Sequence, residues 1–164
     1  SYPGGKEIEK YAINGDENFF ILPKPLINEK NFNFSFSGIK TYVSNLVKKN
    51  KIDKIFKNNL CASFQKNVSE LLVSKLKNGL VVLEKDSVFI KSISVVGGVA
   101  NNKYIKNKLE KFVMNKNIKI FHPLNEMTSD NAAMIAWACI KNYKKQKNDI
   151  FFKPQPRMKV RSVL

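Results

Sequence analysis

Residues 89–115 have the sequence FIKSISVVGGVANNKYIKNKLEKFVMN. Phe89–Val96 is apolar and rich in β-branched residues, which is typical of a strand. The Gly97–Gly98 pair stops that strand, and Asn102–Asn115 follows with apolar residues at the 3.6-residue period of a helix. A second, short strand is predicted at Ile118–Phe121. Because strands alternate with a helix, this part of the chain predicts an α/β fold.

The turn at residues 97–102 is the first candidate for a binding site. A strand that leads through glycines into a helix presents backbone N–H groups at the positive end of the helix dipole. Glycines also let a phosphate or a nucleoside approach the backbone closely, at the sheet edge where α/β proteins bind ligands. The turn is neither a GxGxxG motif nor a Walker loop. It fits a nucleotide site and a tight turn without a ligand equally well.

The rest of the chain predicts further helices and one more strand. An apolar stripe predicts a helix from Leu60 to Asn78, with Gly79 at its C-terminal cap. Three phenylalanines alternate through Asn31–Gly38, so they share one face if this segment is extended, and Ser37 can cap the next helix. The other predicted elements are helices at Lys6–Ala12, Ile39–Lys49 and Ser129–Lys145 and a buried strand at Phe19–Leu22.

Length and composition are those of a globular protein. The chain has 164 residues, 43% of them hydrophobic and 26% charged, which suffices for one domain with a buried core. No apolar run predicts a transmembrane helix, and the first residues show no signal-peptide pattern. With only Cys61 and Cys139, a disulfide framework is not expected and a reducing, cytoplasmic location is. Residues 1–5 resemble the middle of a domain, so we expect a piece of a longer protein.

The formal net charge of +16 has two interpretations. A basic chain can bind nucleic acid through its phosphates. The same balance also arises by compositional drift in an AT-rich genome, which favours lysine, asparagine and isoleucine codons. The basic residues are 27 Lys and 2 Arg, and Arg is the residue preferred for bidentate phosphate and base contacts. We assign the larger share of the charge to drift and keep the basic end of the chain as a candidate RNA contact.

Residues 128–131 lie at the start of the last predicted helix and include Asp130. A Ser or Asp at this position is usually a helix cap, whereas a carboxylate directed into a cleft can bind a metal. Spacing alone favours the cap. His122 is the only histidine, which excludes a histidine-pair metal site within this chain, and no nucleophile–base pair supports a protease. Three further side chains are expected to be buried, namely Cys61, Cys139 and Trp137.

Six motifs in their order and spacing identify a family. They are Tyr2–Gly5 with Ile8–Lys10, Leu22–Leu26, Phe34–Thr41, Ala62–Gln65, Gly97–Ala100 with Asn102, and Ser129–Ala136. Together they resemble the C-terminal half of the TsaD/Gcp family, the tRNA threonylcarbamoyladenosine-modifying transferases once labelled O-sialoglycoprotein endopeptidases. The resemblance covers about residues 1–145. The Ser-Gly-Ile-Lys-Thr sequence at residues 37–41 is similar to that of the bacterial or organellar branch of the family.

The resemblance implies an α/β fold of the actin, Hsp70 and sugar-kinase type (ASKHA). Residues 1–145 would be most of its C-terminal lobe and residues 146–164 a basic tail. It implies transfer of a threonylcarbamoyl group from threonylcarbamoyl-AMP to the amino nitrogen of an adenosine beside the anticodon. It also implies site residues: Gly5 and Glu9 near the ribose, Gly97 and Gly98 near the phosphate or adenosine, Asn102 near the adenine, and Asp130 as one ligand of an iron or zinc ion.

The implied partners are tRNA and TsaB-like and TsaE-like proteins, with no membrane contact. The family's two metal-binding histidines belong to an upstream H-x-x-x-H motif that this chain lacks, and a single carboxylate holds a transition metal poorly. We therefore expect the chain alone to be catalytically silent. The alternative from another class is a non-catalytic nucleotide-binding or interaction lobe of the tRNA-modification complex. A sugar-kinase-like ATPase would share the glycine turn but should lack the Ser-Phe-Ser-Gly segment at residues 35–38.

Overall fold

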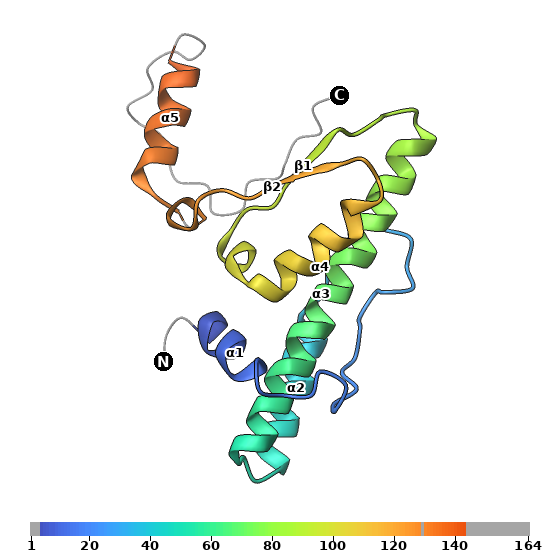
Figure 1. Ribbon diagram of the computed structural model, residues 1–164, viewed down its shortest axis with the longest axis vertical. Coiled ribbons are helices and arrows are strands. Elements are labelled where there is room, and N and C mark those ends of the chain that lie inside the picture. The colour runs from blue at the N-terminus through green and yellow to red at the C-terminus, as the bar shows by residue number, and fades with distance from the viewer. Residues whose placement is uncertain (1–3, 129, 144–164) are drawn as a thin grey trace. The chain divides into compact units, whose positions relative to one another are not determined.

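The computed structural model describes residues 4–128 and 130–143 (Figure 1). Contacts divide the chain into two compact units, residues 1–129 and residues 130–164. The predicted basic tail at 146–164 lies outside the described residues, as does Ser129.

The described part of the first unit combines helices with a small parallel sheet. Its elements are α1 (Gly4–Ala12), α2 (Ser37–Lys49), α3 (Lys54–Lys85), β1 (Ser92–Ser94), η1 (Gly98–Asn101), α4 (Lys103–Met114), β2 (Lys119–Phe121) and η2 (Asn125–Met127). The second unit contains α5 (Ala132–Asn142). The predicted helices are all present and the α/β class is confirmed. None of the described helices is long and apolar enough to cross a membrane.

The two strands pair in parallel, with Ile93 opposite Ile120. The chain leaves β1 through the 3₁₀ helix η1, runs along α4 and returns as β2, which is a β-α-β unit (Figure 1). β1 is shorter than the predicted Phe89–Val96, because its hydrogen bonds to the short β2 extend only from Lys91 O, which accepts from Lys119 N at 3.0 Å, to Val95 N, which donates to Phe121 O at 2.9 Å. Phe89 and Val96 lie beyond the ladder and are 82% and 70% exposed.

The 32-residue helix α3 is the longest element and the centre of the first unit. Asp53 caps its start by accepting a hydrogen bond of 2.7 Å from the backbone N–H of Phe56. The prediction that the helix ends at Gly79 is wrong, since α3 continues to Lys85. A glycine inside a helix costs about 1 kcal/mol relative to alanine, which the good helix formers after it outweigh. Apolar residues of α1, α2 and α4 are buried in this unit, among them Ala12, Ile39, Ile105, Leu109 and Val113.

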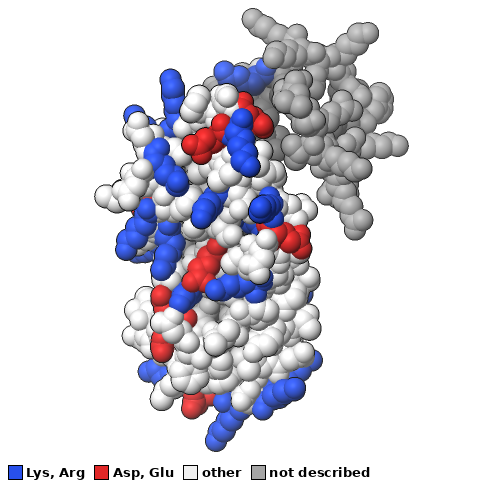
Figure 2. All heavy atoms as spheres, turned by 90° about the vertical axis from the view of Figure 1, so that its right-hand side faces the viewer, with Lys and Arg blue, Asp and Glu red and all other residues white. Residues whose placement is uncertain are grey.

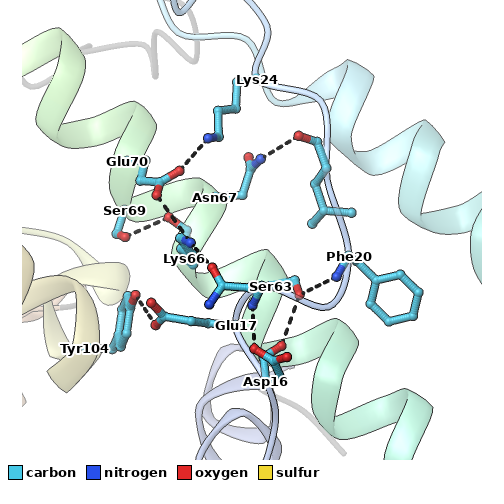
Figure 3. Close-up of polar contacts among 12 residues, drawn as sticks. Asp16, Glu17, Phe20, Lys24, Ser63, Lys66, Asn67, Ser69, Glu70 and Tyr104 are labelled. Atoms are coloured by element: carbon cyan, nitrogen blue, oxygen red, sulfur yellow. Dashed lines mark hydrogen bonds and ion pairs between the residues drawn. The ribbon is translucent and has the colours of Figure 1, made fainter.

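Polar side chains of α3 hold the irregular segment that follows α1 (Figure 3). Ser63 Oγ accepts a hydrogen bond of 3.1 Å from Phe20 N and donates one of 3.3 Å to Asp16 O. Asn67 Nδ2 donates to Leu22 O at 3.0 Å. The predicted strand at Phe19–Leu22 is therefore wrong, because its backbone bonds to helix side chains in place of a neighbouring strand.

Lys75 of α3 holds the next part of this segment. Its side chain is buried, and Nζ donates to the carbonyl oxygens of Leu26, Glu29 and Asn31 at 2.6, 3.0 and 3.2 Å. Asn78 Nδ2 also donates to Glu29 O, at 3.1 Å. Three backbone carbonyls thus solvate an ammonium group that lies away from water, and the loop is fixed in return.

The phenylalanine-rich segment before α2 differs in part from its prediction. The rings of Phe34 and Phe36 stack with centroids 6.0 Å apart, as expected for alternate residues of an extended segment. Ser37 does not cap α2. The helix begins at Ser37, with Phe36 in the cap position and no side-chain cap bond. Ser37 Oγ lies instead 3.4 Å from Ser35 Oγ.

Helix α5 exposes side chains that the sequence predicts to be buried. Trp137 is 60% exposed and Cys139 is exposed, so both predictions are wrong for this structure. The physical reason is that the described part of the second unit offers no other helix or strand to cover α5. In the first unit, Cys61 is half-buried, and this burial raises the pKa of its thiol although nearby Lys57 opposes the shift.

Gly15 permits the close approach of the irregular segment to α3. A Cβ at this position would lie 2.1 Å from the backbone oxygen of Asn58. We predict that Gly15→Ala lowers the free energy of unfolding by about 2 kcal/mol, because the backbone of α3 cannot give way. Urea denaturation checks this. Gly79→Ala is the matched control, since nothing lies within 4 Å of its Cβ, and it should stabilise the protein by about 1 kcal/mol. Equal effects of the two substitutions would contradict this account.

Removing the Lys75 ammonium should destabilise the same region. We predict that Lys75→Met costs about 2 kcal/mol, because it leaves the carbonyl groups of residues 26–31 short of donors. Lys77→Met on the same helix removes an exposed charge and should change stability by less than about 0.5 kcal/mol. Denaturation midpoints of the two variants make the comparison. A neutral Lys75→Met would show that the loop does not depend on this lysine.

Candidate functional site

A polar cavity of about 570 Å³ lies where α1, α3 and the start of α4 meet. α1 contributes Glu9, α3 contributes Gln65, and α4 contributes Lys103 and Tyr104. Figure 1 shows α1 next to the beginning of α4, with α3 passing both. The volume is within the range of about 300–1,000 Å³ that is usual for small-molecule sites.

Glu9 links α1 to α4 at this cavity. Its Oε1 accepts a hydrogen bond of 2.8 Å from the backbone N–H of Lys103, the first residue of α4. A carboxylate at this end of a helix is stabilised by the helix dipole and satisfies a donor that has no partner within the helix. Residues that are 94 positions apart in the sequence are thereby held together.

Asn102 connects α4 to α3. Its Oδ1 accepts a hydrogen bond of 2.9 Å from the N–H of Ile105 and so caps α4. Its Nδ2 donates a hydrogen bond of 2.8 Å to Oε1 of Gln65. The side chain is therefore fixed at both ends by the protein.

These contacts change the expectation that α4 offers free N–H groups to a phosphate. The N–H groups of Lys103 and Ile105 are already bonded to Glu9 and Asn102. Those of Gly98 and Val99 in η1 donate to no residue that the structure describes. Gly97 has φ of +92°, a conformation that requires glycine, so the sequence of the turn follows from its backbone whether or not a ligand binds.

The predicted nucleoside residues do not all line the cavity. Glu9 lines it, and Asn102 lies one hydrogen bond behind it through Gln65. Gly5 is exposed one helical turn before Glu9 on α1, and no atom lies within 4 Å of a Cβ built on it. Gly97 and Gly98 precede Asn102 in the chain but are not part of the lining.

Tyr104 and Glu17 line the cavity and were not among the predicted site residues. Tyr104 OH donates a hydrogen bond of 2.6 Å to Oε2 of Glu17, as Figure 3 shows. Burial of the phenol, together with this bond to the carboxylate, raises the pKa of Tyr104 well above its usual value. The pair joins α4 to the segment that follows α1. Neither residue carries a motif, and their pairing depends on a contact across 87 positions.

The charge around the cavity is mixed. Lys6, Lys10 and Lys103 line it together with Glu9 and Glu17. On the face shown in Figure 2, lysines are spread over the surface with acidic side chains between them. This face does not show the single basic block that is typical of a dedicated nucleic-acid groove, so both interpretations of the net charge stay open.

The predicted metal ligand Asp130 belongs to the second unit and is exposed. It is not the cap of α5, since Asn131 accepts the capping hydrogen bond of 3.0 Å from Met134 N. Among the described residues, no three His, Cys, Asp or Glu side chains lie close enough to share a metal ion. His122 follows β2 and lies 3.4 Å from Glu110. The described residues therefore do not fit a transition metal by themselves.

Comparison with known proteins identifies the family. The family model for TsaD, tRNA N6-adenosine threonylcarbamoyltransferase, matches residues 1–137. The chain belongs to the TsaD family.

Curated TsaD proteins resemble this chain over nearly its whole length. The tRNA N6-adenosine threonylcarbamoyltransferase of Neorickettsia sennetsu is 39% identical over 159 residues, which are 96% of this chain and 47% of that protein. The protein of the same name from Thermosipho africanus is 42% identical over 160 residues, 97% of this chain and 47% of its own length. That of Wolbachia pipientis wMel is 38% identical over 163 residues. The chain spans about half the length of these TsaD relatives.

The raised pKa of Tyr104 gives a test of the geometry of this TsaD cavity. The chain has five tyrosines. When the pH rises past the ordinary tyrosine pKa of about 10, the unfolded chain ionises Tyr104 and the folded chain does not. Stability from this group is thus complete below that pH and is lost as the pH rises further. Ultraviolet titration should find one phenolate fewer in the folded chain, and Tyr104→Phe should remove the difference. A difference that survives in Tyr104→Phe would contradict the contact with Glu17.

Proposed function

We propose that this chain is the C-terminal ASKHA-type lobe of a tRNA N6-adenosine threonylcarbamoyltransferase and forms one side of its nucleotide cleft. The family membership and the coverage of about half of each relative support this proposal. The observation that carries it is the meeting of Glu9 with the start of α4 at a cavity of about 570 Å³. The family resemblance implies that Glu9 and Asn102 bind the nucleoside. Glu9 lines the cavity, and Asn102 is hydrogen-bonded to Gln65, which also lines it.

Each proposed role follows from the chemistry of the side chain. Oε1 of Glu9 accepts the hydrogen bond from the N–H of Lys103. Oε2 is therefore available to accept hydrogen bonds from ribose hydroxyls. Lys6, Lys10 and Lys103 carry the positive charge that a phosphate group needs. The family resemblance also implies the phosphate or adenosine portion near Gly97 and Gly98 and the ribose near Gly5, but these glycines lie outside the cavity lining, so we assign the contacts in the cavity to the side chains that line it.

The proposed reaction is an acyl transfer. The amino nitrogen of the target adenosine attacks the threonylcarbamoyl carbonyl carbon of threonylcarbamoyl-AMP. The bond from that carbon to the phosphate oxygen breaks, AMP leaves, and the nitrogen loses a proton. This chain binds and orients the adenylate, which lowers the entropic part of the barrier. Because its described residues do not make a metal site, we propose that the chain alone is silent and that Asp130 is one ligand of an iron or zinc ion only with ligands from outside the chain.

The proposed partners are the tRNA and TsaB-like and TsaE-like proteins. The relatives are named for a tRNA substrate, and the excess of lysine suits contacts with phosphates that do not depend on sequence.

A second candidate function is a non-catalytic interaction lobe. An apolar cavity of about 540 Å³ supports it, lined by Phe36, Ile39, Val43, Leu60 and Phe64 among others. The neighbouring Phe32 and Phe34 expose about half of their surface, 51% and 50%. An apolar surface of this kind suits a protein partner better than a nucleotide. Absence of nucleotide binding would favour this second function.

Titration of the chain with AMP tests the proposed function. We predict saturable binding in the millimolar range, because one half of a cleft supplies only part of the contacts. Glu9→Gln should weaken binding about tenfold, since a hydrogen bond to a charged acceptor contributes about 1.5–3 kcal/mol. The amide oxygen of the new side chain can still accept from Lys103 N, so the fold should persist. Calorimetry or NMR shift titration makes the measurement.

Glu7→Gln is the control for this titration. It makes the same change of charge on α1 at a residue that does not line the cavity, and it should leave the affinity for AMP unchanged. Equal weakening in the two variants would show that Glu9 acts only through net charge. No saturable binding to the unmodified chain would reject the proposed nucleoside half-site.

A further inference from the structure

Gln65 lies at the floor of the polar cavity and has an unused donor. The residue is only 7% exposed and yet lines the cavity. Its neighbours in the floor are Ala12 and Ala62, which are 8% and 4% exposed. The lysines of the lining, Lys6, Lys10 and Lys103, are all exposed. The cavity thus has a charged rim and a small, apolar floor that carries one amide.

The orientation of the Gln65 amide is fixed by a chain of hydrogen bonds. The backbone N–H of Ile105 can only donate, so the atom of Asn102 that it contacts at 2.9 Å must be the oxygen Oδ1. The nitrogen Nδ2 of Asn102 therefore faces Gln65, and the atom that it contacts at 2.8 Å must be the oxygen Oε1. Exchange of O and N in either amide would break this chain. Nε2 of Gln65 consequently points away from Asn102.

Nε2 has no acceptor within the described residues. Nε2 is not one of the buried atoms that lack a partner, so it is open to the cavity and water can accept its hydrogen bond. A ligand that displaces this water and offers an acceptor keeps the hydrogen bond, whereas a ligand that fills the cavity without an acceptor there leaves the donor unpaired, at a cost of about 1–3 kcal/mol. A donor in such a place selects between ligands of equal shape.

We propose that Gln65 recognises the purine base of the bound nucleoside, with its Nε2–H donating to a ring nitrogen of the base. This inference rests on the proposed function. The phosphate belongs at the rim, where Lys6, Lys10 and Lys103 are exposed, and the flat base belongs on the floor, where Ala12 and Ala62 leave room for a ring. Gln65 is the polar side chain of that floor. Its role goes beyond bonding Asn102, since it contacts the ligand directly.

The test compares adenosine with its 1-deaza, 3-deaza and 7-deaza analogues, in each of which one ring nitrogen becomes C–H. Adenosine carries no phosphate, so the lysine rim contributes little to the comparison. We expect one of the three analogues to bind the unmodified chain about tenfold more weakly than adenosine does. Gln65→Glu should bind adenosine about tenfold more weakly, and in this variant the sensitive analogue should bind no more weakly than adenosine. The new carboxylate still accepts from Asn102 Nδ2, so this variant keeps the support of α4.

Asn59→Asp is the matched control. Asn59 also lies buried on α3, its Oδ1 accepts a hydrogen bond of 2.9 Å from Asp16 N, and it does not line the cavity. The substitution likewise turns a buried amide into a carboxylate, and the loss for the sensitive analogue should persist in it.

Three results would overturn the inference. Equal binding of adenosine and all three analogues to the unmodified chain would do so without any variant. A loss for the sensitive analogue that persists in Gln65→Glu would assign the ring nitrogen to another donor. Failure of both AMP and adenosine to bind the unmodified chain would reject the proposed function and this inference with it. Where AMP binds, the first two results reject the inference alone and leave the proposed function standing.

Discussion

The first unit depends on hydrogen bonds from buried polar side chains of α3 to the backbone of the segment between α1 and α2. Seven of the ten buried residues of this helix are polar, so its inner side does more than fill an apolar core. Asn59, Ser63, Asn67 and Lys75 recur at multiples of four residues and bond to the backbone of the segment between α1 and α2. A buried backbone group without a partner is costly, and here helix side chains provide the partners that a sheet would otherwise provide.

This constraint also positions the cavity. Gly15 lets the chain touch the backbone of α3, and Asp16 is held there by Asn59. Glu17 follows directly and reaches Tyr104 of α4. α1 precedes this contact, so the position of Glu9 depends on it as well. A substitution at Gly15 would therefore shift Glu9 and Glu17 and so change the cavity, although Gly15 itself forms only part of the cavity wall.

The sequence predicts the helices and the two strands β1 and β2 because each has a local signal. Apolar residues repeat at the helical period in α2, α3 and α4, and glycines mark the turn before α4. The prediction of a strand at Phe19–Leu22 was wrong because a short apolar run does not indicate which groups its backbone will hydrogen-bond to. The available signal was the four-residue spacing of Asn59, Ser63 and Asn67. Polar residues at this spacing lie on one side of a helix and indicate a polar partner on that side.

The candidate site was predictable only in part. Glu9 and Asn102 followed from the family resemblance, whereas Gln65, Glu17 and Tyr104 depend on contacts between distant residues. Gln65 belongs to one of the family motifs, at residues 62–65, but nothing in that motif indicates that its amide accepts a hydrogen bond from Asn102. The sequence around Asn102 predicts its cap hydrogen bond with Ile105 N. Its second hydrogen bond, to Gln65, depends on which helix packs against the start of α4.

The contacts at the start of α4 decide how an anion can be held. In many nucleotide sites the first N–H groups of a helix bind the phosphate directly. Here Glu9 and Asn102 already occupy the N–H groups of Lys103 and Ile105, and Glu9 adds a negative charge. The exposed lysine side chains at the rim are the positively charged groups that can attract a phosphate in this cavity, and their attraction is screened by salt. In the complex proposed above, hydrogen bonds to ribose and base would not be screened in this way. Selectivity for the nucleoside would then come from the buried floor and the phosphate would contribute mainly attraction, which suits the proposed release of AMP after transfer.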